Sequence, residues 1–195
     1  DLGGDKPGLS LPQPQLHLFE MVKAVGKPVI VVNVSGSAID LRFADEQADA
    51  VLQCFYPGQD GGKALAEIIF GEVEPTAKLP VTFHTSDDQL PEYTDYSLKG
   101  RTYRYMTEKP LYPFGYGIGY NKYEVSNVTC YAVVGVNGAT VTCDIENLGD
   151  RDGADVVQVY IGHKNKPEAP IYQLIAFDKV WLKAGEKKSV TFDIS

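Results

Sequence analysis

The 195-residue sequence is 44% hydrophobic and 11% aromatic, which is enough apolar material for one or two folded domains. Its formal net charge of −8 argues against nucleic acid and anionic membranes as partners, because a phosphate-binding surface needs clustered lysines and arginines. No apolar run approaches the roughly 20 residues of a membrane helix, and no charged-then-apolar secretory leader opens the chain, which favours the cytoplasm.

The first part of the chain alternates helical and strand patterns. Stretches with apolar residues at helical spacing are separated by short β-branched runs, which are typical of a parallel sheet covered on both faces. The expected helices are 14–25, 41–47 and 61–71, and the expected strands are 28–34, 49–55 and 79–83. This order predicts an open α/β sheet within residues 1–89.

Residues 90–121 have neither a helical nor a strand period. The stretch from Leu90 to Tyr120 contains seven tyrosines and four glycines, whereas a disordered linker is poor in aromatic residues. Tyrosine rings offer apolar faces, and their hydroxyls can bond the backbone of an irregular loop. We therefore expect an ordered strap, defined as residues 90–121, between two domains.

The last part of the chain changes to a period of two. Strands are predicted at 123–134, 139–147, 155–163, 172–182 and 187–194, separated by turns rich in Asn, Gly and Asp. Alternating faces predict an immunoglobulin-like β-sandwich over residues 122–195. Such a sandwich usually has about seven strands, so we expect this one to be truncated at its C-terminus.

Histidine and cysteine spacing predicts no metal site. The three histidines form no HExxH motif and the three cysteines form no CxxC motif. Cys54 lies in an apolar run, which favours a buried thiol over a nucleophile. Cys130 and Cys143 flank a predicted turn at 135–138 that would set them opposite each other; a disulfide and two separate small core residues both stay open.

Two loops follow the carboxyl ends of predicted strands, at 35–37 and 56–62. Ligands of open α/β sheets bind at this edge, so both loops are candidates to face a ligand. Ser35 lacks the GxSxG frame of a nucleophile elbow, and a strand-to-helix turn explains it as well. Asp60 precedes a predicted helix, where a capping role and a catalytic role are the alternatives.

Motifs in order along nearly the whole chain resemble glycoside hydrolase family 3. They are GGD (3–5), LSLP (9–12), GKPVIVV (26–32), FYPGQDGG (55–62), FGEVEPTAKLPVTF (70–83), KGRTYRY (99–105) and YPFGYG (112–117). The later motifs, IENLGDRDGADVVQVYI (145–161), FDKVWL (177–182) and AGEKKSV (184–190), are similar to the fibronectin type III-like domain that follows in many members. Within the family, GGD with SLKGRTYRY most resembles the β-xylosidase and β-glucosidase group.

The resemblance implies a retaining exo-β-glycosidase that uses no metal or organic cofactor. Retention needs a nucleophilic carboxylate and a general acid/base about 5 Å apart. In the family the nucleophile is an aspartate on a preceding barrel, and in the xylosidase-like group the acid/base glutamate lies shortly before GGD. We therefore assign no catalytic residue here, and we expect the chain to be inactive without an N-terminal barrel domain, its implied partner. Oligosaccharides or glycosides would be substrates of the intact enzyme only.

Three residues are candidates to lie near a substrate. Asp5 follows the position of the absent glutamate, although a turn-stabilising role is the alternative. Arg101 and Arg104, in the strap, could bond a sugar or a barrel carboxylate, or stack on tyrosines and tie the loop down. The glycosidase hypothesis predicts an exposed apolar face. The alternatives are a non-catalytic carbohydrate-binding module that displays the strap tyrosines, and a structural interaction domain.

Overall fold

The structure, a computed structural model, describes residues 8–133 and 138–194. Contacts divide the chain into two compact units: residues up to Gly62 together with Pro80–Phe114, and Lys63–Leu79 together with the residues from Gly115 onward. The predicted domain boundaries at 89/90 and 121/122 stay predictions. No helix in the described ranges is long and apolar enough to cross a membrane.

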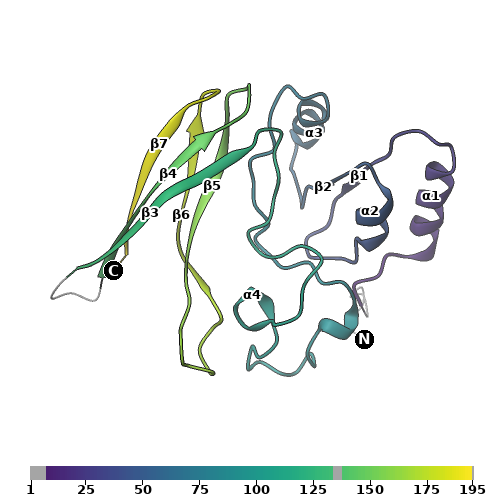
Figure 1. Cartoon of the computed structure of the whole chain (residues 1–195). Helices are drawn as coiled ribbons and strands as arrows, with labels where there is room; N and C mark the ends of the chain where they lie inside the picture. The colour runs from purple at the N-terminus through teal and green to yellow at the C-terminus, as the bar shows by residue number, and fades with distance from the viewer. Residues whose placement is uncertain (1–7, 134–137, 195) are drawn as a thin grey trace. The chain divides into compact units, whose positions relative to one another are not determined.

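The first unit contains a parallel two-stranded sheet, as predicted. Strands β1 (Ile30–Asn33) and β2 (Ala50–Gln53) pair in parallel with Ile30 opposite Ala50, and helices α1 (Gln13–Lys23) and α2 (Arg42–Gln47) accompany them (Figure 1). Prolines occupy the N-cap and first turn of α1, where a missing N–H costs nothing. Phe19 of α1 meets Phe43 of α2 edge to face, with ring centroids 4.9 Å apart.

Asp49 ties the start of both strands to the end of α1. Its carboxylate accepts hydrogen bonds from the Val29 backbone N–H at 2.8 Å and from Lys23 Nζ at 3.3 Å. These bonds lower the pKa of Asp49 below its ordinary value, the Val29 bond most strongly. The C-terminal end of α1 is therefore held to the sheet by Asp49, whose carboxylate binds both the lysine of the helix and a backbone N–H next to β1.

The prediction of a strand at 79–83 is wrong, because the structure has no strand there. Among the described residues this stretch contributes a single antiparallel bridge, from Phe83 to Tyr112, closed by the Phe83 N–H at 2.8 Å and the Tyr112 N–H at 3.2 Å. Leu79 also donates to the Tyr116 carbonyl at 2.7 Å and accepts from the Gly115 N–H at 2.8 Å. Pro80 has no N–H and cannot donate to a sheet ladder, so these bonds do not form a continuous strand. Phe83 is nevertheless buried. The part of the strap that belongs to the first unit, residues 90–114, holds one short helix, α4 (Thr102–Tyr105).

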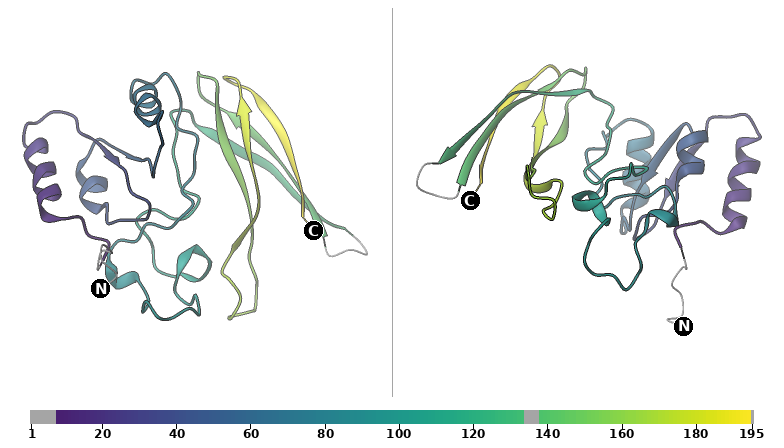
Figure 2. Two further views of the ribbon diagram at one scale, coloured as in Figure 1. Left: turned by 180° about the vertical axis from the view of Figure 1, so that it is seen from behind. Right: turned by 60° about the horizontal axis from the view of Figure 1, so that its bottom comes forward.

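The second unit is a β-sandwich with the five strands that the sequence predicts. One sheet has the order β3-β4-β7 and the other pairs β5 with β6 (Figure 2). The strands are β3 (Tyr123–Val133), β4 (Gly138–Asn147), β5 (Gly153–Ile161), β6 (Gln173–Leu182) and β7 (Lys187–Ile194). Their inward residues form one core of Cys143, Ile145, Val157, Val180, Leu182 and Phe192.

Helix α3 (Gly61–Ile69) begins at the border of the first unit and continues into the second. Within the second unit, Tyr120 Oη donates to the Ile68 carbonyl at 2.5 Å, and Arg151 Nη1 donates to the Gly71 carbonyl at 3.0 Å. Lys78 forms an ion pair with Asp155 of β5 at 2.7 Å. Residues 63–79, called the α3 segment, are therefore bonded to the β-sandwich.

Cys130 and Cys143 do not face each other across the hairpin. Val133 pairs with Gly138, a register that puts Cys130 opposite Val141 and leaves Cys143 two residues further along. The predicted alignment is wrong because the strands leave residues 134–137, and not 135–138, between their paired ends, and this shift of one residue moves the pairing by two; residues 134–137 themselves lie outside the described ranges. All three cysteines are free thiols, and burial raises the pKa of Cys54 and Cys143.

Candidate functional site

A polar cluster lies at the carboxyl ends of β1 and β2, the edge at which open α/β sheets bind ligands. Asn33 and Gln53, the last residues of the two strands, are paired in register. Asn33 Nδ2 donates to Gln53 Oε1 at 2.5 Å and to Ser35 Oγ at 2.9 Å. Ser35 Oγ in turn donates to the Ser37 carbonyl at 2.8 Å, so the 35–37 loop is fixed by side chains of both strands.

Tyr56 packs over this loop. A Cβ atom at Gly36 would lie 2.6 Å from the Tyr56 ring, so glycine is what allows the ring to approach the loop backbone. The tyrosine itself is 78% exposed. Its neighbour Phe55 has φ +48°, a conformation that non-glycine residues rarely adopt and that often marks functional loops. The strand-end cluster, defined as Asn33, Ser35 and Gln53, is thus held by its own hydrogen bonds and has the exposed Tyr56 ring beside it.

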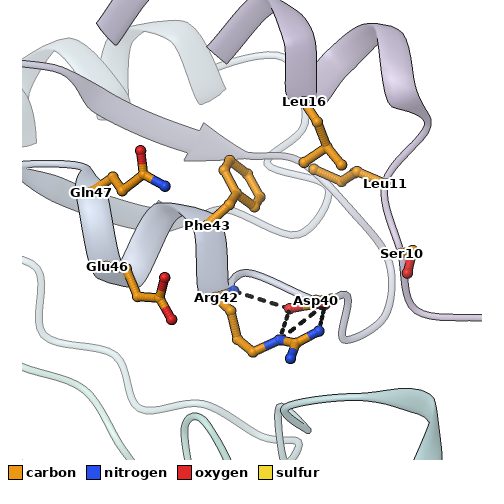
Figure 3. Close-up of a pocket in the computed structure, with 8 residues that line it drawn as sticks. All are labelled: Ser10, Leu11, Leu16, Asp40, Arg42, Phe43, Glu46 and Gln47. Carbon is orange, nitrogen blue, oxygen red and sulfur yellow. Dashed lines mark hydrogen bonds and ion pairs between the residues drawn. The ribbon is translucent and has the colours of Figure 1, made fainter. Parts of the chain in front are cut away.

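A pocket of about 300 Å³ lies in the same unit (Figure 3). One part of its wall is apolar and the other polar. The lining residues are Ser10, Leu11, Leu16, Asp40, Arg42, Phe43, Glu46 and Gln47. A small concave site with apolar walls and a few polar groups is the usual form of a small-molecule site.

Arg42 and Asp40 form a two-pronged ion pair at this pocket. Arg42 Nη2 and Nε lie 2.6 Å and 3.0 Å from the two carboxylate oxygens of Asp40, and the Arg42 backbone N–H donates to the same carboxylate at 3.0 Å. Burial alone would raise the pKa of Asp40, but the bonds from Arg42 outweigh it and lower that pKa. Asp40 is therefore an ionised acceptor and a poor proton donor at neutral pH.

Asp40→Asn is expected to destabilise the chain by less than about 1 kcal/mol at pH 7, because the pair is partly exposed and screened by solvent. The folded-state pKa of Asp40 is lowered, so this contribution is present above the unfolded pKa, near 3.8, and is lost as the pH falls through the folded value. Urea unfolding at pH 7 and pH 3 measures it. A loss that stays the same at both pH values would contradict the assignment.

Of the candidate residues named from sequence, the two that the structure describes, Arg101 and Arg104, do not line this pocket. Asp5 lies outside the described residues. Arg101 Nη2 donates to the Glu92 carbonyl at 2.5 Å, and the Arg104 guanidinium lies over the Tyr105 ring, 5.9 Å from its centroid. Both arginines are thus bonded within the strap, and neither lines the pocket of Figure 3.

Sequence reasoning missed Asn33, Gln53, Asp40 and Arg42. One signal was present: an amide residue interrupts each apolar run near its end, and side chains at the carboxyl ends of adjacent parallel strands meet at one edge. Among residues 8–133 and 138–194, no group of three His, Cys, Asp or Glu side chains is placed to hold a metal ion.

Comparison with known proteins identifies the fold. The model of the glycosyl hydrolase family 3 C-terminal domain matches residues 3–120, and that of the fibronectin type III-like domain matches residues 155–195. The chain belongs to glycosyl hydrolase family 3. Both the resemblance in the motifs and the predicted fold class, an α/β domain followed by a fibronectin type III-like domain, are confirmed.

Relatives and solved structures agree. The chain is 41% identical over 193 residues to a xylan 1,4-beta-xylosidase of Xylanibacter ruminicola. The matched region covers 99% of this chain and 22% of that protein. A periplasmic beta-glucosidase of Salmonella typhimurium is 38% identical, with 97% of this chain and 27% of that protein covered. The crystal structure of a GH3 beta-glucosidase from Bifidobacterium adolescentis superposes with a TM-score of 0.87 at 32% identity, covering 100% of this chain and 31% of that one. The chain thus spans about a quarter of these proteins and corresponds to their C-terminal part.

Proposed function

We propose that this chain is the C-terminal portion of a retaining exo-β-glycosidase of the β-xylosidase or β-glucosidase type, which hydrolyses O-glycosyl bonds only together with an N-terminal barrel domain. The observation that carries the proposal is the 41% identity over 99% of the chain to a xylosidase of which it covers only 22%. A retaining mechanism needs two carboxylates about 5–5.5 Å apart. The resemblance to the family implies that both carboxylates lie upstream of the matched motifs.

The proposed role of the chain is to complete the substrate pocket from the side of the α/β domain. The strand-end cluster of Asn33, Ser35 and Gln53 offers amide and hydroxyl groups suited to sugar hydroxyls. Asp5, Arg101 and Arg104 remain proposed substrate-proximal residues. Arg101 and Arg104 would act by holding the strap in shape, since their guanidinium groups bond and stack within it.

The test is hydrolysis of p-nitrophenyl β-xyloside and β-glucoside by the chain, alone and mixed with the preceding part of the Xylanibacter ruminicola relative. We expect activity in the mixture only, and the better substrate would name the sugar. Hydrolysis by the chain alone would show that catalytic carboxylates lie within it. Association without any hydrolysis would contradict the glycosidase role.

A carbohydrate-binding module is the second candidate, favoured by one feature of β6. Phe177 and Trp181 lie four residues apart on one strand face, are 67% and 61% exposed, and flank Lys179, whose Nζ lies 5.2 Å from the Trp181 ring centroid. Exposed aromatic faces suit stacking on sugar rings. Because Trp181 is the chain's one tryptophan, quenching of its fluorescence by xylo-oligosaccharides, absent in Phe177→Ala, would support this role.

A further inference from the structure

Tyr56 is fixed at the phenol end of its ring and exposed over the rest. A Cβ atom at Gly36 would lie 2.6 Å from Cε2 of this ring and 2.8 Å from its hydroxyl oxygen, so the ring rests on the backbone of the 35–37 loop. The residue is nevertheless 78% exposed. A ring held in this way offers a preformed apolar face to a ligand.

The backbone on both sides of Tyr56 is also fixed. Before it, the Cys54 N–H donates to the last carbonyl of β1 at 2.9 Å, and Phe55 has φ +48°. After it, Pro57 packs so closely on Gly61 that a Cβ atom there would lie 2.6 Å from the proline ring. A rarely adopted backbone conformation persists only where its surroundings impose it. The ring therefore loses little conformational freedom when a ligand stacks on it, which lowers the cost of binding.

The groups next to this ring are polar and uncharged. The loop below it belongs to the strand-end cluster, where Asn33 Nδ2 donates to Ser35 Oγ at 2.9 Å, and the neighbouring Ser37 is exposed. Amides and hydroxyls both donate and accept hydrogen bonds, as sugar hydroxyls do. An aromatic face suits the C–H face of a sugar ring. The net charge of −8 disfavours an anionic ligand, so the neighbourhood of Tyr56 fits a neutral sugar.

We propose that Tyr56 is a sugar-stacking residue of the intact enzyme, and that it binds the pyranose on the leaving-group side of the bond that is cut. The proposal rests on the proposed function. An exo-acting enzyme encloses the terminal sugar, because its pocket admits one unit only, and a residue as exposed as Tyr56 does not fit an enclosed pocket. The next sugar of an oligosaccharide lies at the open mouth, where one aromatic face is sufficient. Tyr56 thus selects oligosaccharides over glycosides with a small leaving group.

The first test compares xylotriose with methyl β-xyloside, whose methyl group offers no ring to stack. Both are given to the chain combined with the preceding part of the Xylanibacter ruminicola relative. Tyr56→Ala is expected to lower kcat/KM for xylotriose about tenfold, mainly through KM, and to leave that for methyl β-xyloside within about twofold. Equal losses for the two substrates, or no loss, would overturn the proposal. Loss of association between the two pieces would overturn it as well, because Tyr56 would then be an interface contact.

Gly36→Ala tests the position of the ring without removing it. Gly36 does not have a positive φ, and the nearest neighbours of its added Cβ atom all belong to Tyr56, so alanine must displace the ring. We expect the same selective loss for xylotriose, at least about threefold. Gly62→Ala is the matched control, because nothing lies within 4 Å of its added Cβ atom, and it should stay within about twofold. Equal effects of the two glycine variants, each confirmed as folded by circular dichroism, would contradict the proposal.

Nuclear magnetic resonance separates this proposal from the proposed function. In the chain alone, saturation of aromatic protons is expected to transfer to xylotriose, and Tyr56→Ala should reduce this transfer at least about threefold. Tyr131→Ala, which removes a ring that is 67% exposed on β3, should not. Transfer that depends on Tyr56, with no hydrolysis by the combined pieces, would support stacking and contradict the glycosidase role. Hydrolysis with no transfer that depends on Tyr56 would overturn stacking and leave the glycosidase role standing.

Discussion

Ile145→Ala is expected to destabilise the β-sandwich by about 2–5 kcal/mol. Ile145 is fully buried in β4, at the centre of the core that joins the two sheets. Truncation removes its transfer free energy and leaves a cavity that rigid strands on both sides close only in part. Urea unfolding, followed by circular dichroism and by the fluorescence of Trp181 on β6, measures the loss.

Ile118→Ala is the matched control. The same atoms are removed from a side chain that is 75% exposed and belongs to the same unit. Its expected cost is below about 0.5 kcal/mol. Equal losses for the two variants would mean that the core is not where the structure places it.

Periodicity was sufficient to predict most elements of this fold. The β-branched run at 28–34 contains β1, and the alternating stretches at 139–147 and 187–194 coincide almost residue for residue with β4 and β7. Both periods are direct consequences of backbone geometry, so they survive without knowledge of tertiary contacts. The fold class followed from them and is confirmed by the family match.

The failures came where a contact between distant segments decides the local structure. The apolar run 79–83 reads as a strand, but its one bridge depends on Tyr112, about thirty residues later. The residue opposite Cys130 depends on strand register, and register depends on which four residues separate the strands, 134–137 or 135–138, which turn residues alone left ambiguous.

The sequence predicted where a site would lie, at the carboxyl ends of the strands, but not which side chains would meet there. The 35–37 loop was identified because ligand sites collect at the carboxyl ends of parallel strands. The bond between Asn33 and Gln53 needs the β1–β2 register, which no local pattern contains. The ion pair of Asp40 and Arg42 is local, yet many side chains two residues apart never meet, so spacing could not single it out.

Glu74 connects the α3 segment to the first strand of the sandwich. Its carboxylate accepts hydrogen bonds from the Asn121 backbone N–H at 2.6 Å, from Asn121 Nδ2 at 3.0 Å and from Tyr123 Oη at 2.7 Å. Gly153 makes room for it, because a Cβ atom there would overlap the carboxylate. Burial and the bond to Glu74 raise the pKa of Tyr123 to about 12.

Tyr123→Phe is expected to cost about 1.5–3 kcal/mol at pH 8, because Glu74 loses a donor to a charged acceptor. The matched variant Tyr131→Phe, on the same strand but 67% exposed, is expected to cost less than about 0.5 kcal/mol. Urea unfolding of the three proteins gives both differences. Similar losses for the two variants would contradict a specific bond between Tyr123 and Glu74.

The cost of Tyr123→Phe is also expected to depend on pH. The folded-state pKa of Tyr123 is raised from 10 to about 12, so the protonated phenol is favoured in the folded chain. Its contribution is therefore complete below pH 10 and is lost as the pH rises toward 12. The stability difference between the original chain and Tyr123→Phe should then shrink over this interval, because an ionised Tyr123 repels Glu74 where the neutral phenol donates to it. A difference that stays constant from pH 8 to pH 12 would mean that the ionisation of Tyr123 is not coupled to its bond with Glu74.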